Sequence, residues 1–571
     1  MSSRPRNSTL LDALIAALLA LAALVALTGG FEIALGSFTL RSHSAWRVLA
    51  VALIPIGARV RLALSEPTGS ASSGTGRRVE REPVRLVLLT LIFLSIGYWF
   101  KYLLTTVGGA DSYGYASAAR LLASGRLIAA APIAEWLSPA NRLALASPLG
   151  WAPSGNGAGI SPTYPLGLPA LMALVSIVTR ANVIFYVSPA MSLLTLWLVF
   201  RLARRWGDEQ TALLATALVA WNPVFLTYAK QPMSDAAATA WLTLAVILAV
   251  DDPHLIPAHS IRRSALAGVA AGAAFLTRPA LLAAVALIPL LGWRGASPIK
   301  RMLIASAGIA AAGAARLALQ SYMFGNPFTT GYGSAEALFS WAALPENLDI
   351  YARQSWRALG WLWIVAAGAG AWAWRGPRTT TILAVAAAVA LPYLFYLRFD
   401  HWETLRFLLP GIVPLSILAA AGVITLARSL RVPAITAVVI VLFAGAFAVR
   451  SERLMRESSV WEIENLEARY PLVGQWFQVN TPPASVALAS QHSGSLRWYG
   501  DRQTVRWDLL RPEDLITTVR ELEAHGATVY AALEGTEQQG FDAKFSTELA
   551  RLSVDPVGHV RNVSFLRLKS Q

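Results

Sequence analysis

The sequence has no cysteine and few charged residues. The absence of cysteine among its 571 residues excludes disulfide bonds, thiolate metal ligands and cysteine nucleophiles. Only 14% of the residues are charged, whereas soluble domains average about 25%. At the same time 55% of the residues are hydrophobic and the mean hydropathy is +0.50. We therefore expect most of the chain to be solvated by lipid.

Acidic residues are scarcer than basic ones, with 33 Asp and Glu against 48 Lys and Arg and a net charge of +15. In a soluble protein this excess would suggest a nucleic-acid partner. In a chain this hydrophobic, loop charge that sets membrane topology is the better explanation, and we expect no nucleic acid.

The sequence is rich in long apolar runs, and a helix that spans a membrane needs about 20 such residues. The first run follows Arg4 and Arg6, but no small-x-small cleavage site follows it, so we expect a retained helix and not a signal peptide. Runs of spanning length lie near 10–28, 45–64, 84–104, 183–200, 211–228, 235–250, 301–318, 357–374, 380–397, 407–427 and 432–449.

Two further apolar stretches do not fit a simple spanning helix. The segment 166–178 covers about 20 Å, against a hydrocarbon core of about 30 Å, so we place it on the membrane surface. The segment 264–292 is interrupted by Arg278 and Pro279. A straight helix would put Arg278 near the bilayer centre, at a cost of about 2.5 to 3.5 kcal/mol. Two short helices with Arg278 at the turn, inside a water-filled cavity, avoid this cost.

These choices predict about 13 crossings, a cytoplasmic N-terminus and an extracytoplasmic C-terminus. The basic residues of the short loops support this parity, because each loop placed inside carries at least two of them. The basic clusters of these inside loops are Arg77, Arg78 and Arg81; Arg201, Arg204 and Arg205; Arg262 and Arg263; Arg294, Lys300 and Arg301; Arg375 and Arg378; and Arg428 and Arg431. Counting 264–292 as one crossing would export three of these six clusters.

The predicted fold class is an all-α polytopic membrane protein with a small α/β domain at its C-terminal end. We divide the chain into an N-terminal two-helix unit (1–64), a flexible cytoplasmic linker (65–83), a transmembrane module (84–450) whose first large outside loop is 105–182, and an extracytoplasmic domain (451–571). The last domain has ordinary globular composition. Its pattern alternates between a strand, a helix and a strand, at 485–490, 513–525 and 528–533.

Two acidic residues stand at the outside ends of predicted spans. Asp111 opens the first outside loop and Asp235 lies where the run 235–250 begins. Each could cap a helix, and Ser234 could do the same for the second. Each could also act as a general base, a metal ligand or a charge stabiliser in a shared cavity. Lys230, one turn away, could pair with Asp235 or with an anionic substrate.

The basic candidates on the same side are Arg278 and Arg406, since the planar fork of arginine suits bidentate phosphate binding. For Arg406 the alternative is snorkelling to the interface. His401 and Glu403 lie close to Arg406 in the sequence and form an interfacial polar cluster or part of a cavity wall.

Tyrosines add further candidates for the cavity lining. Tyr113, Tyr164 and Tyr332 fall in the predicted outside loops. Such residues serve as interface anchors in most membrane proteins, and they could also line a groove for sugar or lipid.

Several motifs, taken in order, resemble the C-type (GT-C) membrane glycosyltransferases. The chain is similar in particular to the bacterial branch related to protein O-mannosyltransferases and lipid A aminoarabinose transferase, over about residues 84–450. The N-terminal two-helix unit is extra to that core. The motifs are DSYGYASAARLLASG from Asp111, SPTYPLGLPALMAL from Ser161, PMSD ending at Asp235, LTRP around Arg278 and LRFLLPGIVPL around Arg406.

The resemblance implies transfer of a hexose or pentose, with inversion, from a polyprenyl-phosphate donor to an acceptor lipid, glycan or protein outside a bacterial inner membrane. Asp111 would then be the base, Asp235 the second acid, and Arg278 and Arg406 the ligands of the donor phosphate. The Asp111 motif lacks the acidic pair of many protein mannosyltransferases. No cofactor is required by the pattern, and a divalent metal stays open.

Two other classes of protein share the general pattern. A transporter or lipid flippase also has many helices and buried charges, but it usually shows inverted repeats and charges at the bilayer midplane, and this sequence shows neither. A non-catalytic scaffold would not need Asp111, Asp235, Arg278 and Arg406 on one side of the membrane.

Overall fold

The computed structural model describes residues 31–35, 38–42, 75–180, 183–250, 257–293, 297–333 and 337–571. The predicted spans 10–28 and 45–64 lie outside the described residues. Of the N-terminal part, the structure describes one antiparallel pair of strands, β1 (Phe31–Leu35) and β2 (Phe38–Ser42).

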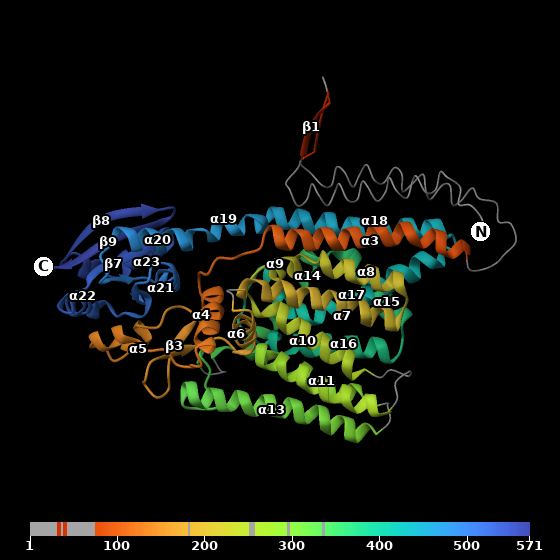
Figure 1. Ribbon diagram of the computed structural model, residues 1–571, viewed down its shortest axis with the longest axis horizontal. Coiled ribbons are helices and arrows are strands. Elements are labelled where there is room, and N and C mark those ends of the chain that lie inside the picture. Colours follow the sequence, from red (N-terminus) through yellow and green to blue (C-terminus); the bar gives the residue numbers. More distant parts are fainter. Residues whose placement is uncertain are drawn as a thin grey trace.

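Most of the described chain is a bundle of helices that run along the longest axis of the molecule, with a small α/β domain at one end (Figure 1). Within the described residues, six helices are long and apolar enough to cross a membrane, or seven if one pair bent by 65° counts as a span. The protein is therefore a multi-pass membrane protein. The six are Pro83–Lys101 of α3, Ile184–Trp206 (η2 and α7), Pro298–Phe324 (α13), Pro377–Leu394 (α16 and η6), Trp402–Ser429 (η7 and α17) and Pro433–Glu457 (α18), and the bent pair is α8 (Glu209–Ala220) with α9 (Pro223–Ala229).

Four shorter apolar elements complete the apolar part of the bundle: α6 (Gly167–Thr179), α10 (Ser234–Ala249), η3 with α12 (Pro279–Leu291) and α15 (Trp361–Ala373). The count of about 13 crossings stays a prediction, because the spans identified are fewer and two of those predicted are not described. The bend between α8 and α9 has a local cause. Pro223 cannot donate a backbone hydrogen bond, and the Asn222 side chain instead accepts from the first amides of α9.

Two boundaries differ from the prediction. Helix α3 (Thr75–Lys101) begins inside the segment assigned to the linker 65–83, with Pro83 within the helix. The run 357–374 is not one span, because α14 (Leu344–Leu359) and α15 are separated by Gly360, whose φ is +81°. Only glycine adopts this conformation without strain, so the helix stops there. Hydropathy alone does not reveal this stop, because Gly360 lies within an apolar run.

Small residues allow the helices of the bundle to approach closely. A Cβ atom at Gly370 of α15 would lie 1.8 Å from the Leu418 carbonyl oxygen of α17, and one at Gly308 of α13 would lie 2.8 Å from the Gly268 backbone of α11 (Pro257–Thr277). Such contacts are typical of helix pairs in lipid, where packing replaces the hydrophobic effect.

The first large loop, which the sequence predicts to lie outside, folds into its own small layer between the bundle and the C-terminal domain. It contains α4 (Asp111–Ala123), α5 (Arg142–Leu145) and the strands β3 (Trp151–Pro153) and β4 (Ile160–Pro162). Helix α6 follows it and packs on α4. Figure 1 views α6 nearly end-on, so that it lies across the direction of the bundle helices, as the sequence predicts for 166–178.

The C-terminal domain is a five-stranded sheet of order β6-β5-β7-β9-β8 with helices packed on it. The strand, helix and strand expected at 485–490, 513–525 and 528–533 are confirmed as β5 (Ser485–Leu488), α22 (Leu515–Ala524) and β7 (Thr528–Glu534). Strands β5, β6 (Gln503–Val505) and β7 are parallel, and β8 (Leu552–Val560) and β9 (Val563–Ser570) form an antiparallel pair beside β7. Helices α20 (Arg469–Asn480), α21 (Ser493–Tyr499) and α23 (Gly535–Lys544) complete it.

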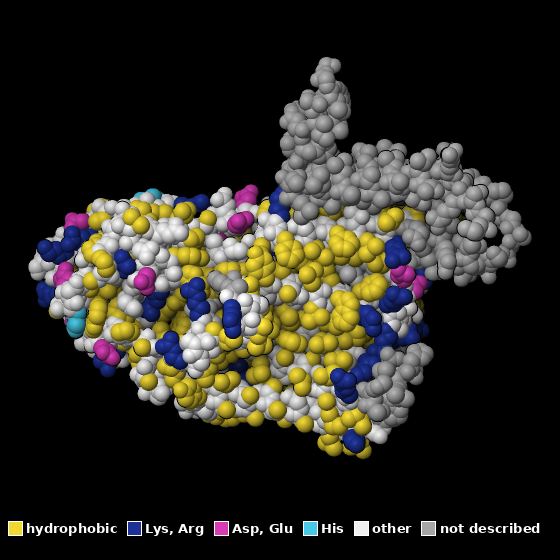
Figure 2. All heavy atoms as spheres, viewed as in Figure 1, with side chains coloured by type: hydrophobic (Ala, Val, Ile, Leu, Met, Phe, Trp, Pro, Cys, Tyr) yellow, Lys and Arg dark blue, Asp and Glu magenta, His cyan; other side chains and the backbone are white. Residues whose placement is uncertain are grey.

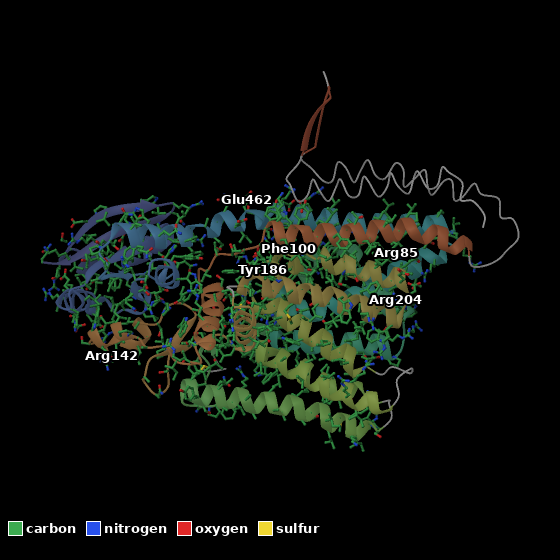
Figure 3. All side chains as sticks on the ribbon, in the orientation of Figure 1. Arg85, Phe100, Arg142, Tyr186, Arg204 and Glu462 are labelled. Atoms are coloured by element: carbon green, nitrogen blue, oxygen red, sulfur yellow. The ribbon has the colours of Figure 1, made fainter. Side chains whose placement is uncertain are left out.

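Those predicted cytoplasmic arginines whose side chains the structure describes gather at the end of the bundle opposite this domain. Arg204 lies there and Arg142 lies at the other end in Figure 3. Arg428 forms an ion pair with Asp208, and Arg378 donates to the Trp206 carbonyl oxygen. Loops predicted to be on one side thus meet at one end, while the broad hydrophobic surface in Figure 2 lies between that end and the C-terminal domain. The orientation of the two ends relative to the membrane stays a prediction.

Candidate active site

A cavity of about 460 Å³ lies where several polar helix ends converge beside the first outside loop. Six of the predicted site residues line it. Four are charged: Asp111 at the start of α4, Asp235 at the start of α10, Arg278 at the turn between α11 and α12, and Arg406 in η7. The other two are Tyr164 and Tyr332. The other walls are mostly apolar and aromatic. They include Pro162, Leu166, Met233, Leu276, Leu319, Met323, Phe324, Phe328, Leu338, Phe339, Tyr393, Tyr396, Phe399 and Phe407.

Asp111 is the first residue of α4, but its carboxylate does not cap that helix. The Tyr164 hydroxyl donates to Oδ1 over 2.5 Å, and Nη1 of Arg406 lies 3.2 Å from Oδ2. The Asp111 side chain is 29% exposed and that of Arg406 is 25% exposed. The carboxylate is therefore held by two donors and still reachable from the cavity, which excludes simple helix capping.

Asp235 also does not cap its helix. It lies 2.5 Å from Nη2 of Arg278, and the two side chains are only 2% and 10% exposed. Nη1 of Arg278 donates to the backbone carbonyl oxygen of Arg406 over 3.1 Å. The two acid–arginine pairs are thus joined, because Arg278 of the buried pair supports the backbone that carries Arg406 of the open one.

The turn at Arg278 agrees with the expectation of two helices that meet in a cavity. Helix α11 ends at Thr277, Arg278 is extended, and η3 and α12 return from it. The guanidinium lies 5.8 Å from the Phe407 ring, whose π face favours a cation. A charged side chain in this part of the bundle is thereby paired, hydrogen-bonded and stacked, as its cost in an apolar environment requires.

Three tyrosines form a hydroxyl-rich wall beside Asp111. The rings of Tyr115 and Tyr164 lie 4.8 Å apart and those of Tyr164 and Tyr332 lie 5.8 Å apart. The Tyr115 hydroxyl donates to Ser234 Oγ. Burial and the charge of Asp111 raise the pKa of the Tyr164 hydroxyl, so it stays protonated and able to donate.

Sequence reasoning missed Arg316, which lines the cavity from α13. Its contact recorded in the described part of the chain is with the Phe275 ring, 5.8 Å from the guanidinium carbon, whereas Arg278 and Arg406 each pair with an aspartate. The signal was present, since Arg316 is a charge inside the predicted span 301–318 and such charges are functional candidates. Tyr115 and Gln320 were missed too, and no spacing in the sequence pointed to them.

Four predicted site residues do not line the cavity. Lys230 is buried and donates to the Val460 carbonyl oxygen over 2.7 Å, away from the two arginines. Tyr113 packs beneath the C-terminal domain, where its ring would meet a Cβ at Gly494. His401 and Glu403 precede Arg406 in the chain, yet neither faces the cavity.

The carboxylates of the cavity do not form a metal-binding set. Asp111 and Asp235 each accept from an arginine, and in the described ranges no three His, Asp or Glu side chains group at ligand distance. A divalent metal prefers carboxylate and other oxygen ligands without a cation already seated among them. The residues of this cavity therefore do not fit a metal.

Comparisons with known proteins bear on the fold. No protein-family model and no curated protein sequence matches the chain. The solved structure of ArnT from Cupriavidus metallidurans in the apo state is similar with a TM-score of 0.53 at 11% identity, over 84% of this chain and 97% of that one. The same enzyme bound to undecaprenyl phosphate gives 0.52 at 10% identity, over the same shares.

This chain therefore has the fold of the GT-C membrane glycosyltransferases, and the resemblance predicted from the sequence is confirmed at that level. Among the solved structures similar to it, ArnT is a lipid A aminoarabinose transferase of this class. The archaeal oligosaccharyltransferase of Archaeoglobus fulgidus, of the same superfamily, is more distant, with a TM-score of 0.46 at 13% identity over 78% of this chain and 69% of that one.

Proposed function

We propose that this protein is a membrane glycosyltransferase that moves a sugar, with inversion, from a polyprenyl-phosphate-linked donor to an acceptor hydroxyl. The observation that carries the proposal is the convergence of two aspartates and three arginines on one cavity, in a fold shared with an enzyme solved in complex with undecaprenyl phosphate. The aspartates would supply the base for the acceptor hydroxyl, and the arginines would bind the donor phosphate.

The charge of the cavity suits a lipid monophosphate. The charge of Asp235 is balanced by Arg278 and that of Asp111 by Arg406. The five ionised side chains of the lining therefore have a net charge of one positive unit, which Arg316 contributes. A polyprenyl-phosphate sugar is a phosphodiester with a single negative charge. Arg316 would bind this phosphate first. Its ion pair with the phosphate would be strong, because the surrounding wall is apolar and few waters compete.

Asp111 is the candidate base. Its carboxylate is the more exposed of the two, and each oxygen has a lone pair left after Tyr164 and Arg406 have donated. An acceptor hydroxyl placed within hydrogen-bond reach could lose its proton there. Tyr164 and Arg406 would hold the carboxylate in one orientation while the acceptor approaches.

Asp235 plays a different part, that of a positioning residue. At 2% exposure it has no room for an acceptor, but it fixes the fork of Arg278 at the cavity wall. Arg278 has five N–H donors, of which the described structure uses one for Asp235 and one for the Arg406 backbone. The remaining donors and Arg406 would stabilise the charge that grows on the leaving phosphate.

In the proposed transfer step, the acceptor oxygen attacks the anomeric carbon as the bond from that carbon to the phosphate oxygen breaks. The anomeric configuration inverts. The acceptor proton passes to Asp111, and polyprenyl phosphate leaves with one more negative charge than the diester carried. That increase is where the arginines contribute most, because they stabilise the transition state more than the bound donor.

The remaining features are inferred from the apolar runs and basic loops of the sequence and from the resemblance. We place the protein in a bacterial inner membrane with about 13 crossings, the N-terminus cytoplasmic and the C-terminal domain outside. The cavity then faces the extracytoplasmic side, where the arginine-rich end of the bundle does not lie. The transferred sugar is a hexose or pentose, and the acceptor is a lipid, a glycan or a protein.

The purified protein in lipid nanodiscs tests the proposal directly. Undecaprenyl-phosphate hexoses and pentoses with a radiolabelled sugar are supplied with membrane extract as acceptor, and label leaving the donor is counted. We expect transfer by the wild type and a loss of about 10²- to 10⁴-fold for Asp111→Asn. Asp542→Asn, which changes an exposed aspartate of the C-terminal domain, should leave the rate unchanged.

Two results would overturn the proposal. One is full activity of Asp111→Asn, which would remove the base. The other is movement of labelled donor lipid across the bilayer of sealed vesicles with no release of sugar, which would favour a flippase.

A further inference from the structure

The C-terminal domain contacts the segment that carries Asp111 but contributes nothing to the cavity wall. Every described lining residue falls between Asp111 and Phe407. Residues 451–571 therefore do not touch a substrate held there. They nevertheless contact residues 104–150: α21 lies beside α4 in Figure 1, and hydrogen bonds join the two parts at Val107, Ala146 and Leu149.

A tight contact of this kind lies between Tyr470 of α20 and Gly108. A Cβ atom on Gly108 would lie 2.0 to 2.4 Å from three carbons of the Tyr470 ring, so only glycine fits beneath it. The next residue, Gly109, has φ of +58° and lies against the Tyr470 hydroxyl and the Gln491 amide. A Gly-Gly turn is thus pressed against one buried aromatic ring, three residues before Asp111.

Ser112 joins the turn to α4 by hydrogen bonds. The Gly108 amide donates to Ser112 Oγ over 3.0 Å, and that hydroxyl donates back to the Gly108 carbonyl oxygen over 2.8 Å. Ser112 is the neighbour of Asp111 in the first turn of α4. One residue earlier in the loop, the Val107 amide donates to the Tyr499 hydroxyl of the C-terminal domain over 2.8 Å.

Tyr470 is itself held by a polar network within the C-terminal domain. Its hydroxyl accepts from Gln491 Nε2 over 2.6 Å and from Arg469 over 3.1 Å. Arg469 and His492 both contact Glu534 at the end of β7, at 2.9 and 3.0 Å. The Tyr470 side chain is 1% exposed, and both hydrogen-bond partners of its hydroxyl belong to the C-terminal domain.

From these contacts we propose that Tyr470 is a positioning residue for Asp111, and that the C-terminal domain serves the transfer reaction by fixing this carboxylate from behind. The inference rests on the proposed function, since it takes Asp111 as the base. A displacement of the order of 1 Å in a reacting group can lower a rate about 10²-fold. A ring that seats the turn three residues away is placed to prevent such a displacement.

The chain offers a matched pair of glycines for the test. Gly108→Ala drives a methyl group into the Tyr470 ring, and Gly558→Ala drives one into the Trp476 ring, where a Cβ would lie 2.1 Å from a ring carbon. Neither glycine has a positive φ, so alanine is opposed by the ring alone. Both changes strain the C-terminal domain, and only the first acts on the Asp111 segment.

In nanodiscs with the labelled undecaprenyl-phosphate sugar as probe, we expect Gly108→Ala to lower kcat about 10- to 100-fold with the donor KM within about twofold. Gly558→Ala should keep the wild-type kcat. Tyr470→Phe, which keeps the ring, should retain most of the rate, and Tyr470→Ala combined with Gly108→Ala should recover activity relative to Gly108→Ala alone.

Hydrogen exchange provides a readout that does not need activity. Residues 105–115 should exchange faster in Gly108→Ala than in the wild type, and should be unchanged in Gly558→Ala. Equal kcat losses in the two alanine variants, or unchanged exchange in Gly108→Ala, would overturn the inference. If Asp111→Asn is fully active in the same assay, the proposed function fails instead, and the exchange result still decides whether Tyr470 seats the turn.

Discussion

The two acid–arginine pairs of the cavity differ in burial although their aspartates occupy similar positions at helix starts. Asp111 and Asp235 both stand in the first turn of a helix, and each pairs with an arginine from a segment far along the chain. The Asp235 pair is almost completely enclosed, at 2% and 10% exposure, whereas the Asp111 pair is 29% and 25% exposed. Equal chemistry in unequal surroundings therefore leads to different roles.

The difference teaches which pair can react. A buried ion pair is rigid and costly to break, because removal of one partner leaves an uncompensated charge out of water. A partly exposed pair contributes little to stability, but its acid can reach a substrate. The enclosed pair sets the geometry of the cavity and the open pair meets the acceptor.

The largest effect is expected from Asp235→Asn. It leaves the Arg278 charge buried without its partner, which should cost about 3 to 5 kcal/mol of stability. Asp111→Asn should cost less than about 1 kcal/mol, because both members of its pair are partly exposed. Thermal unfolding in detergent, followed by tryptophan fluorescence, measures both. Equal melting temperatures for the two variants would mean that burial does not separate the pairs.

The next effect concerns the cation that neither acid neutralises. Arg316→Gln should weaken donor binding by about 1.5 to 3 kcal/mol, the worth of a hydrogen bond to a charged group, which is roughly 10- to 100-fold in the KM for the lipid-linked sugar. Arg316→Lys should keep part of the affinity as a point charge. Titration with undecaprenyl phosphate gives the same comparison without turnover. An unchanged KM would remove Arg316 from the donor site.

A smaller effect should follow from loss of the hydroxyl that orients the open acid. Tyr164→Phe removes the donor to Asp111 Oδ1, and we expect kcat to fall about 10-fold, equivalent to about 1.4 kcal/mol. Tyr322→Phe removes the hydroxyl of a tyrosine that is 60% exposed on α13 and serves as the control. Steady-state kinetics with a saturating donor separates the two, and similar rates for both variants would contradict the role of Tyr164.

The smallest effect concerns an acid outside the membrane. The His492 hydrogen bond and the Arg469 charge lower the pKa of Glu534. Its stabilising contribution, about 1 kcal/mol, should therefore be fully present above the unfolded pKa near 4.3 and be lost as the pH falls through the lower folded value. Melting curves of wild type and Glu534→Gln between pH 3 and 7 should converge at the acid end. A constant difference across that range would exclude this linkage.

Much of the architecture could be predicted because hydropathy is a local property of the sequence. The apolar runs at 183–200, 301–318 and 432–449 are confirmed within α7, α13 and α18. The turn at Arg278 followed from the cost of a charge in lipid, and a helix too short to span the bilayer is found at 166–178, as its length predicted. Local signals failed where a single residue overrides an apolar run, as Gly360 does between α14 and α15.

The candidate site was predicted in part. The acids and two of the arginines were found because polar residues at the ends of apolar runs stand out from their neighbours. Lys230 stood out in the same way, yet the structure turns it toward the Val460 carbonyl and the Trp461 ring. Arg316 was overlooked within a run that hydropathy averaged into a span. The position of a residue at the end of an apolar run can be read from the sequence, but the direction of its side chain cannot.

The sequence by itself determined a cysteine-free, lipid-solvated bundle, the order of its apolar segments, and the few ionisable residues placed at their ends. Only the tertiary structure decided which of those residues meet. Arg278 and Asp235 are 43 residues apart and Arg406 and Asp111 are 295 apart. No periodicity of the chain relates such positions, since each pairing follows from how whole helices pack. The same holds for Tyr470, which the fold brings from the far end of the chain to the glycine turn before Asp111.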